Sequence, residues 1–179
     1  MDNFSIERVA DRQEIEYRVM SFCRGVDRRD KDLARSAFHD NGTDDHGGFA
    51  GPVDGLLDWI WERHEKLPVC FHHVGSVSID FVDENNAMCE SYCITIISSE
   101  GENVDPDAEE KPQILTFNRY VDHFVRRDGA WRIETRKTIL EAKMPVPGSA
   151  NPLPVNGIKP TRDENDYSWQ LRRKLGLRK

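Results

Sequence analysis

The spacing of hydrophobic residues changes at about Pro68, and this change constrains the fold more than any other feature of the sequence. Before it, apolar residues recur every three or four positions, which is typical of amphipathic helices. We therefore predict helices over residues 6–27, 30–38 and 52–66. The turn-rich stretch HDNGTDDHGGFAGP, which precedes the third helix, is expected to hold one short pair of strands.

After Pro68, apolar and polar residues alternate, as they do in strands with one buried face. We predict strands over residues 71–81, 87–99, 114–126 and 131–143, the last two joined by a hairpin turn at RDG. Helices followed by a run of strands indicate the α+β class. We expect a curved antiparallel sheet with the three N-terminal helices packed on one face, forming a cone-shaped barrel around an internal pocket.

A chain of 179 residues is long enough for one domain with a substantial core. We assign residues 1–143 to the α+β domain and residues 144–179 to a C-terminal arm. The first part of the arm, residues 144–160, holds five of the nine prolines and is expected to be extended. A short terminal helix is predicted from Asp163.

Composition narrows the classes of function that this chain can have. A formal charge of −7 argues against general nucleic-acid binding, because such a surface repels a phosphate backbone. The sequence has no apolar run long enough for a transmembrane helix, and its acidic, polar start is unlike a signal peptide. The four cysteines form no CxxC pair. We expect reduced packing cysteines in a cytoplasmic protein.

Three residues could carry chemistry, although each has an ordinary structural interpretation. His73 shares strand parity with Val77, so we expect it to face the apolar side, with His72 facing outward. An inward histidine is commonly a hydrogen-bonded core residue. Asp27 could simply bond a backbone N–H at a helix end, and Arg136 could form a surface ion pair.

Together these residue types form a sufficient set for proton abstraction followed by elimination. A buried histidine acts as the base, and an aspartate fixes its tautomer and stabilises the imidazolium. An arginine stabilises the charge that develops on a leaving group. Simple alternation places Arg136 opposite Trp131 and Ile133, although a bulge in the strand would reverse its direction.

Three motifs, GVDRRD, FHHVGSVSIDF and RRDGAWRIETR, resemble those of the SnoaL-like branch of the nuclear transport factor 2-like superfamily. Within it the chain is most similar to the group of scytalone dehydratase, lindane dehydrochlorinase and bile-acid dehydratase. The resemblance implies a cone-shaped α+β barrel. It also implies that Asp27 orients the catalytic His73, and that Arg136, five residues after Trp131, assists departure of the leaving group.

The remaining assignments concern the pocket and possible metals. Asp44, Asp45 and His46 could be a metal site, a solvated loop or part of the pocket wall, and three residues on a short strand supply too few metal ligands. We expect neither a metal nor a cofactor, and we assign His64 and His72 to the surface or an interface. The predicted pocket residues are Phe22, Cys23, Asp45, Phe49, Trp61, Val77 and Phe117.

The favoured function is a cofactor-independent lyase, a dehydratase or a dehydrohalogenase, acting on a small apolar cyclic molecule. The same histidine and aspartate could instead serve an isomerase or a cyclase. A third interpretation is a non-catalytic module that binds a ligand or supports assembly, like the small subunit of a ring-hydroxylating dioxygenase. The expected partner is a small-molecule substrate, with neither a nucleic acid nor a membrane, and the resemblance implies a homotrimer or a homodimer.

Overall fold

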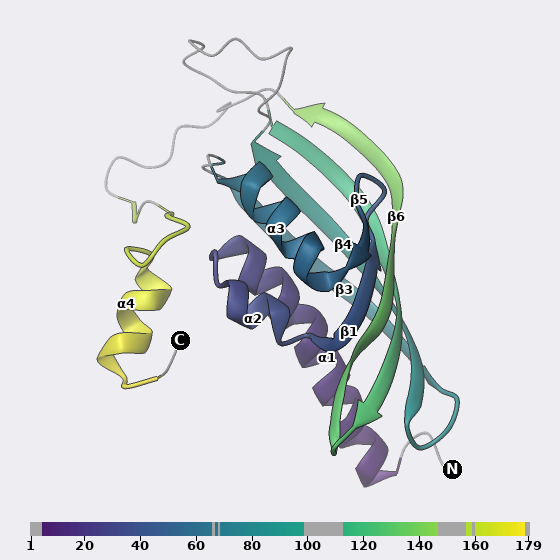
Figure 1. Ribbon diagram of the computed structural model, residues 1–179. Coiled ribbons are helices and arrows are strands. Elements are labelled where there is room, and N and C mark those ends of the chain that lie inside the picture. The colour runs from purple at the N-terminus through teal and green to yellow at the C-terminus, as the bar shows by residue number, and fades with distance from the viewer. Residues whose placement is uncertain are drawn as a thin grey trace.

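A computed structural model describes residues 5–65, 67, 69–98, 113–146, 157–158 and 160–177. Its elements are α1 (Ile6–Asp27), α2 (Lys31–Arg35), β1 (Phe38–Asp45), β2 (Ala50–Pro52), α3 (Val53–His64), β3 (Cys70–Phe81), β4 (Asn86–Ser98), β5 (Gln113–Arg127), β6 (Ala130–Val146) and α4 (Tyr167–Lys174). Figure 1 shows α1, α2 and α3 on one face of a single curved sheet. None of the described helices is long and apolar enough to cross a membrane.

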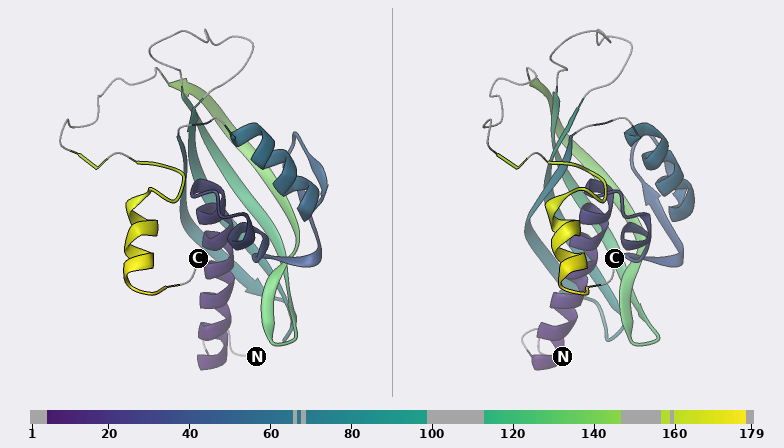
Figure 2. Two further views of the ribbon diagram at one scale, coloured as in Figure 1. Left: turned by 60° about the vertical axis from the view of Figure 1, so that its left-hand side comes forward. Right: turned by 90° about the vertical axis from the view of Figure 1, so that its left-hand side faces the viewer.

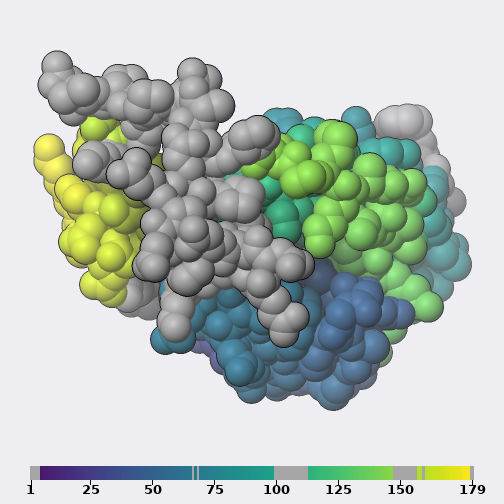
Figure 3. All heavy atoms as spheres, turned by 90° about the horizontal axis from the view of Figure 1, so that it is seen from above, coloured from purple at the N-terminus to yellow at the C-terminus, as the bar shows by residue number. Residues whose placement is uncertain are grey.

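The sheet has six strands in the order β2-β1-β6-β5-β4-β3, and it is open rather than closed into a full barrel. The predicted α+β class and curved sheet are confirmed. The expectation of a purely antiparallel sheet is wrong at one pairing, because β1 runs parallel to β6. These two strands are far apart in the sequence, so no hairpin forces them to be antiparallel. Seen from above, the atoms of the blue segment β1 adjoin those of green β6 (Figure 3).

Helix α1 is the main support of the core. Its buried stripe contains Ile15, Val19, Phe22 and Val26, which recur at helical spacing. The glycine before Val26 lets α2 pack closely, because a Cβ at that position would lie only 2.5 Å from the backbone nitrogen of Ala34. Helix α1 therefore ends in a tightly packed corner of the molecule.

The boundaries of the elements differ modestly from the predicted ones. The second helix ends at Arg35 rather than at residue 38, because Phe38 already belongs to β1. The hairpin between β5 and β6 is confirmed, with Asp128 and Gly129 both at positive φ (52° and 78°). Two consecutive residues at positive φ suit the twist of a tight hairpin turn.

A β-bulge in β3 reverses the faces of its first half. The register with β4 shifts between Gly75 and Val77, so that Ser76, at a φ of 39°, is an extra residue. Because side chains alternate with a period of two, one inserted residue moves every preceding side chain to the opposite face. His72 therefore faces the helices, and His73 is exposed on the other side.

A second bulge, in β6, decides the direction of Arg136. The register with β5 shifts so that Glu134 is the extra residue between Ile133 and Thr135. Arg136 consequently shares the inner face with Trp131 and Ile133, and all three are buried. Simple alternation would direct Arg136 away from Trp131 and Ile133, but the bulge directs it to the same face as these two residues.

The C-terminal helix α4 lies beside α1 in both views of Figure 2. It begins at Tyr167, later than predicted, because Asp166 caps it by accepting a hydrogen bond from the Ser168 backbone N–H. Trp169 is buried beneath the Arg24 guanidinium of α1. Strand β6 continues past the predicted domain boundary, and most of the predicted proline-rich arm lies outside the described residues.

Candidate active site

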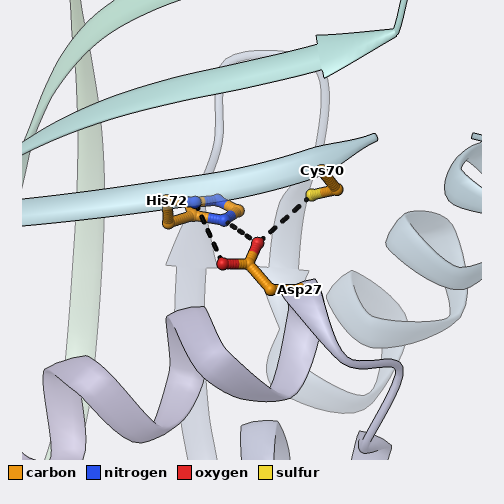
Figure 4. A group of neighbouring side chains, drawn as sticks. All are labelled: Asp27, Cys70 and His72. Carbon is orange, nitrogen blue, oxygen red and sulfur yellow. Dashed lines mark hydrogen bonds and ion pairs between the residues drawn. The ribbon is translucent and has the colours of Figure 1, made fainter. Parts of the chain in front are cut away.

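The shortest side-chain hydrogen bond between α1 and the sheet, among the described residues, joins Asp27 to His72. The Nδ1 atom of His72 lies 2.6 Å from Oδ1 of Asp27, and the backbone N–H of His72 donates to Oδ2 at 3.0 Å (Figure 4). Both side chains are about nine-tenths buried. Because Nδ1 is held by the carboxylate, Nε2 is the ring nitrogen that remains to exchange a proton.

The predicted contact between Asp27 and His73 is therefore wrong. His73 is exposed, and the imidazole that contacts the Asp27 carboxylate is that of His72. The sequence pattern predicts His72 to lie on the surface. The error comes from counting strand parity through the bulge at Ser76. A glycine inside a strand often marks a bulge, so Gly75 is the available signal.

The environment of His72 strongly favours its protonated form. Burial alone lowers the pKa of this imidazole, but the hydrogen bonds and charges of Asp27 and Cys70 outweigh burial and raise the pKa to about 10. At neutral pH the resting pair is thus an imidazolium and a carboxylate. An imidazolium formed during a reaction would be stabilised in the same way.

Two further residues adjoin this pair. The thiol of Cys70, two positions earlier on the same face of β3, donates to Oδ1 of Asp27 at 3.4 Å. Nδ1 of His64, at the end of α3, lies 3.9 Å from the Cys70 sulfur. Burial, together with the positive charge of Arg162, lowers the pKa of His64 to about 4, so this imidazole is neutral at neutral pH.

Arg162 holds the two helix ends that carry the site. Its buried guanidinium donates to the backbone carbonyls of Val26 and Asp27 in α1, at 2.8 and 3.1 Å. It also donates to the carbonyls of His64 and Leu67, at 3.2 and 3.0 Å. A cation is favourable at the carbonyl end of a helix, and here one cation serves two such ends. No local pattern in the sequence identifies this residue.

His72 lines a cavity of about 380 Å³ between the sheet and α3. This volume suits a small organic ligand. The apolar part of its wall includes Phe22 and Trp59, while Thr95 and Thr116 bring hydroxyl groups to it. These two hydroxyls bond each other across neighbouring strands. The wall is therefore more polar than the sequence predicts.

Of the predicted pocket residues, only Phe22 lies in the wall of this cavity. Phe117 sits between Thr116 and Asn118, which line the cavity, so strand alternation directs it to the outer face. Asp45 is exposed, and Cys23 is buried in the core. The others pack against the core: Phe49, Trp61 and Val77.

His46 brings a second histidine–aspartate pair to the cavity wall. Its Nδ1 atom lies 3.2 Å from Oδ1 of the buried Asp44 and 3.1 Å from the hydroxyl of Thr138. Oδ2 of Asp44 is buried and has no hydrogen-bond partner among the described residues. The sequence leaves open whether residues 44–46 form a metal site, a solvated loop or part of the pocket wall. The position of His46 fits the pocket wall.

Arg136 is buried behind the cavity wall. Nε and one terminal nitrogen bond the two carboxylate oxygens of Asp122, each at 2.7 Å. The guanidinium stacks 4.8 Å from the ring centre of Phe22 and 4.2 Å from that of Tyr120, two residues that line the cavity. Arg136 thus supports the wall, and its charge is neutralised by Asp122, so it is poorly placed for the leaving-group role that the resemblance implies.

Solved structures with this fold include hexachlorocyclohexane dehydrochlorinase (LinA) Type2, with a TM-score of 0.69 and 20% identity over 86% of this chain and 99% of that one. LinA-type3 from Novosphingobium barchaimii gives a TM-score of 0.68 and 20% identity over 85% and 99% of the two chains. A protein from Novosphingobium aromaticivorans that was assigned as a scytalone dehydratase gives a TM-score of 0.64 and 19% identity over 76% and 87%. At such identities the likeness establishes the fold alone.

Comparison at the level of sequence establishes the family. No curated protein matches the chain. The profile of the SnoaL-like domain matches residues 7–137, which include Asp27, His72 and Arg136 but not Arg162. Because this match spans most of its length, the chain belongs to the SnoaL-like domain family.

Proposed function

We propose that this protein is a lyase that removes water, or a hydrogen halide, from a small cyclic compound by proton transfer at His72. The observation that carries the proposal is the 2.6 Å contact between Asp27 and His72 at the wall of a cavity. An aspartate that holds one ring nitrogen of a histidine leaves the other to act as acid and base. The elimination needs no cofactor.

The proposed cycle uses one histidine twice. Neutral His72 takes a proton from a carbon next to a carbonyl group, and the C–H electron pair forms the new double bond as the neighbouring C–O bond breaks. The imidazolium, stabilised by Asp27, then gives the proton to the departing hydroxide, so that water leaves and His72 is neutral again. Because the pKa of His72 is raised to about 10, the neutral form is minor at pH 7, and kcat/KM should rise with pH.

The cavity wall indicates the kind of substrate. Its aromatic and aliphatic residues suit an apolar ring, while Thr95, Thr116 and Asn118 can bond oxygen atoms on that ring. We therefore propose a cyclic substrate in which the carbon that loses the proton lies between a carbonyl carbon and the carbon that bears the leaving group. LinA is named as a dehydrochlorinase of a chlorinated ring, so a halide is a second leaving group to test.

The experiment exploits adjacent histidines on opposite faces of β3. A panel of hydroxylated and halogenated cyclic ketones is incubated with the protein, and products are followed by mass spectrometry. We expect His72→Gln to lower turnover by roughly 10²–10⁴-fold, because general acid–base catalysis contributes about that much. His73→Gln, the matched control, should keep full turnover. Equal losses in both variants, or none in either, would contradict the proposal.

The same pair could serve an isomerase, which returns the proton to another carbon. In that case the product has the mass of the substrate and carries deuterium when the reaction runs in D₂O. The non-catalytic interpretation predicts that Asp27 and His73 lie apart, as they do. Catalysis is favoured because His72 takes the expected place of His73 beside Asp27, at the wall of an open cavity.

A further inference from the structure

Four side chains with metal-binding atoms converge beside the cavity. Asp27 comes from the end of α1, Cys70 and His72 from β3, and His64 from the end of α3. The donor atoms of Asp27, Cys70 and His72 all lie within 4.8 Å of one another (Figure 4). The Nδ1 atom of His64 adds a fourth donor, 3.9 Å from the Cys70 sulfur.

This donor set suits zinc. Thiolate, imidazole and carboxylate are the ligands of Zn²⁺, whereas Mg²⁺ and Ca²⁺ prefer oxygen atoms alone. Tetrahedral bonds of about 2.0–2.3 Å place neighbouring donor atoms roughly 3.3–3.8 Å apart. The Asp27–Cys70 separation of 3.4 Å meets this requirement, and the Cys70–His64 separation of 3.9 Å is close to it.

The contact between Asp27 and His72 shows one change that must accompany entry of a metal. The Asp27–His72 separation of 2.6 Å is that of a hydrogen bond, so these two atoms must part by about 0.7 Å to hold a zinc ion between them. The ion would replace two protons, one from Nδ1 of His72 and one from the Cys70 thiol, and both go to solvent. A thiolate and a carboxylate together neutralise a divalent cation, which makes burial of the ion acceptable.

We propose that Asp27, His64, Cys70 and His72 form a reversible site for Zn²⁺. An ion bound to Nδ1 of His72 and to Asp27 leaves the proton on Nε2, so His72 can no longer accept a proton and the enzyme is inhibited. This inhibitory consequence rests on the proposed function, whereas metal binding itself does not. The site would make activity depend on free zinc.

Cobalt(II) provides a test that needs no substrate. Co²⁺ is titrated into protein freed of metal with a chelator. We expect one equivalent to bind per chain, with the near-ultraviolet charge-transfer band of a Co–thiolate bond, visible bands of a four-coordinate ion, and displacement by Zn²⁺. Proton release, measured in weak buffer, should approach two per ion at a pH where His72 and Cys70 are both protonated. The absence of a thiolate band at saturating Co²⁺ would overturn the site.

Variants identify the ligands. Cys70→Ser should abolish the charge-transfer band, and His64→Gln should keep the band but weaken binding at least about tenfold. The matched control, His73→Gln, should bind like the wild type, and circular dichroism verifies that each variant is folded. A band that persists in Cys70→Ser, or unchanged affinity in His64→Gln, contradicts the assignment. If Co²⁺ does not bind, the proposed proton transfer still stands, because turnover is assayed with a chelator present. If Co²⁺ binds normally but no substrate is turned over, the proposed function is contradicted and the metal site still stands.

Discussion

Replacing Asp27 with asparagine should remove a pH-dependent part of the folding free energy. In the folded protein the pKa of His72 is about 10, against an ordinary value of about 6.5. The folded state therefore binds this proton more tightly than the unfolded state does. The resulting stabilisation is fully present below pH 6.5 and is lost as the pH rises towards 10.

The size of this effect follows from the two pKa values. They differ by about 3.5 pH units, and each unit corresponds to about 1.4 kcal/mol, so Asp27 and Cys70 together contribute at most about 5 kcal/mol near pH 6. Between about pH 6.5 and pH 9, about 3 kcal/mol of it should disappear. The amide introduced by Asp27→Asn retains the shape of the side chain but not its charge, so this variant should not show the loss.

Urea unfolding of the wild type, Asp27→Asn and His73→Gln at about pH 6.5 and pH 9, with a chelator present, measures the loss. We expect the free energy of unfolding of the wild type to exceed that of Asp27→Asn by several kcal/mol at the lower pH. At the higher pH this difference should be smaller by about 3 kcal/mol. His73→Gln keeps the Asp27–His72 pair and should follow the wild type. A stability difference between wild type and Asp27→Asn that does not change with pH would refute the reasoning.

Three substitutions test the supports of the site by urea unfolding. Arg162→Met should lower the free energy of unfolding by roughly 2–4 kcal/mol, because it leaves four carbonyls without their donor, whereas the exposed Arg173→Met should have little effect. Arg136→Met should cost roughly 3–5 kcal/mol by leaving Asp122 buried and unpaired, and the added change Asp122→Asn should restore most of that loss. Ser76→Gly should stabilise the protein by up to about 1 kcal/mol, because glycine adopts the φ of 39° without strain, and a destabilisation would contradict the account of the bulge.

The architecture could be predicted because the hydrophobic pattern follows it directly. Helical spacing in α1 and α3 and alternation from β3 onward reflect which faces are buried in the structure. The hairpin turn at Asp128-Gly129 has a strong local signal, since both residues tolerate positive φ. Parallel pairing of β1 with β6 has no such signal, because it depends on how distant segments meet.

The candidate site was only partly predictable. Asp27 and the neighbourhood of the histidine followed from motif and spacing, but the choice between His72 and His73 depends on one inserted residue, Ser76. A period-two pattern does not determine where a bulge lies, although a glycine beside it is a hint. Arg162 could not be found from sequence, since its role comes from packing of the C-terminal segment against two helix ends.

The most direct test of the proton-transfer pair is an NMR titration of the His72 imidazole in the wild type and in Asp27→Asn, both freed of metal. We predict that the wild-type ring titrates near pH 10, and that its pKa falls well below that value in the variant, where burial acts without the carboxylate. A wild-type His72 that titrates near its ordinary value of about 6.5 and does not respond to the loss of the carboxylate would contradict the account.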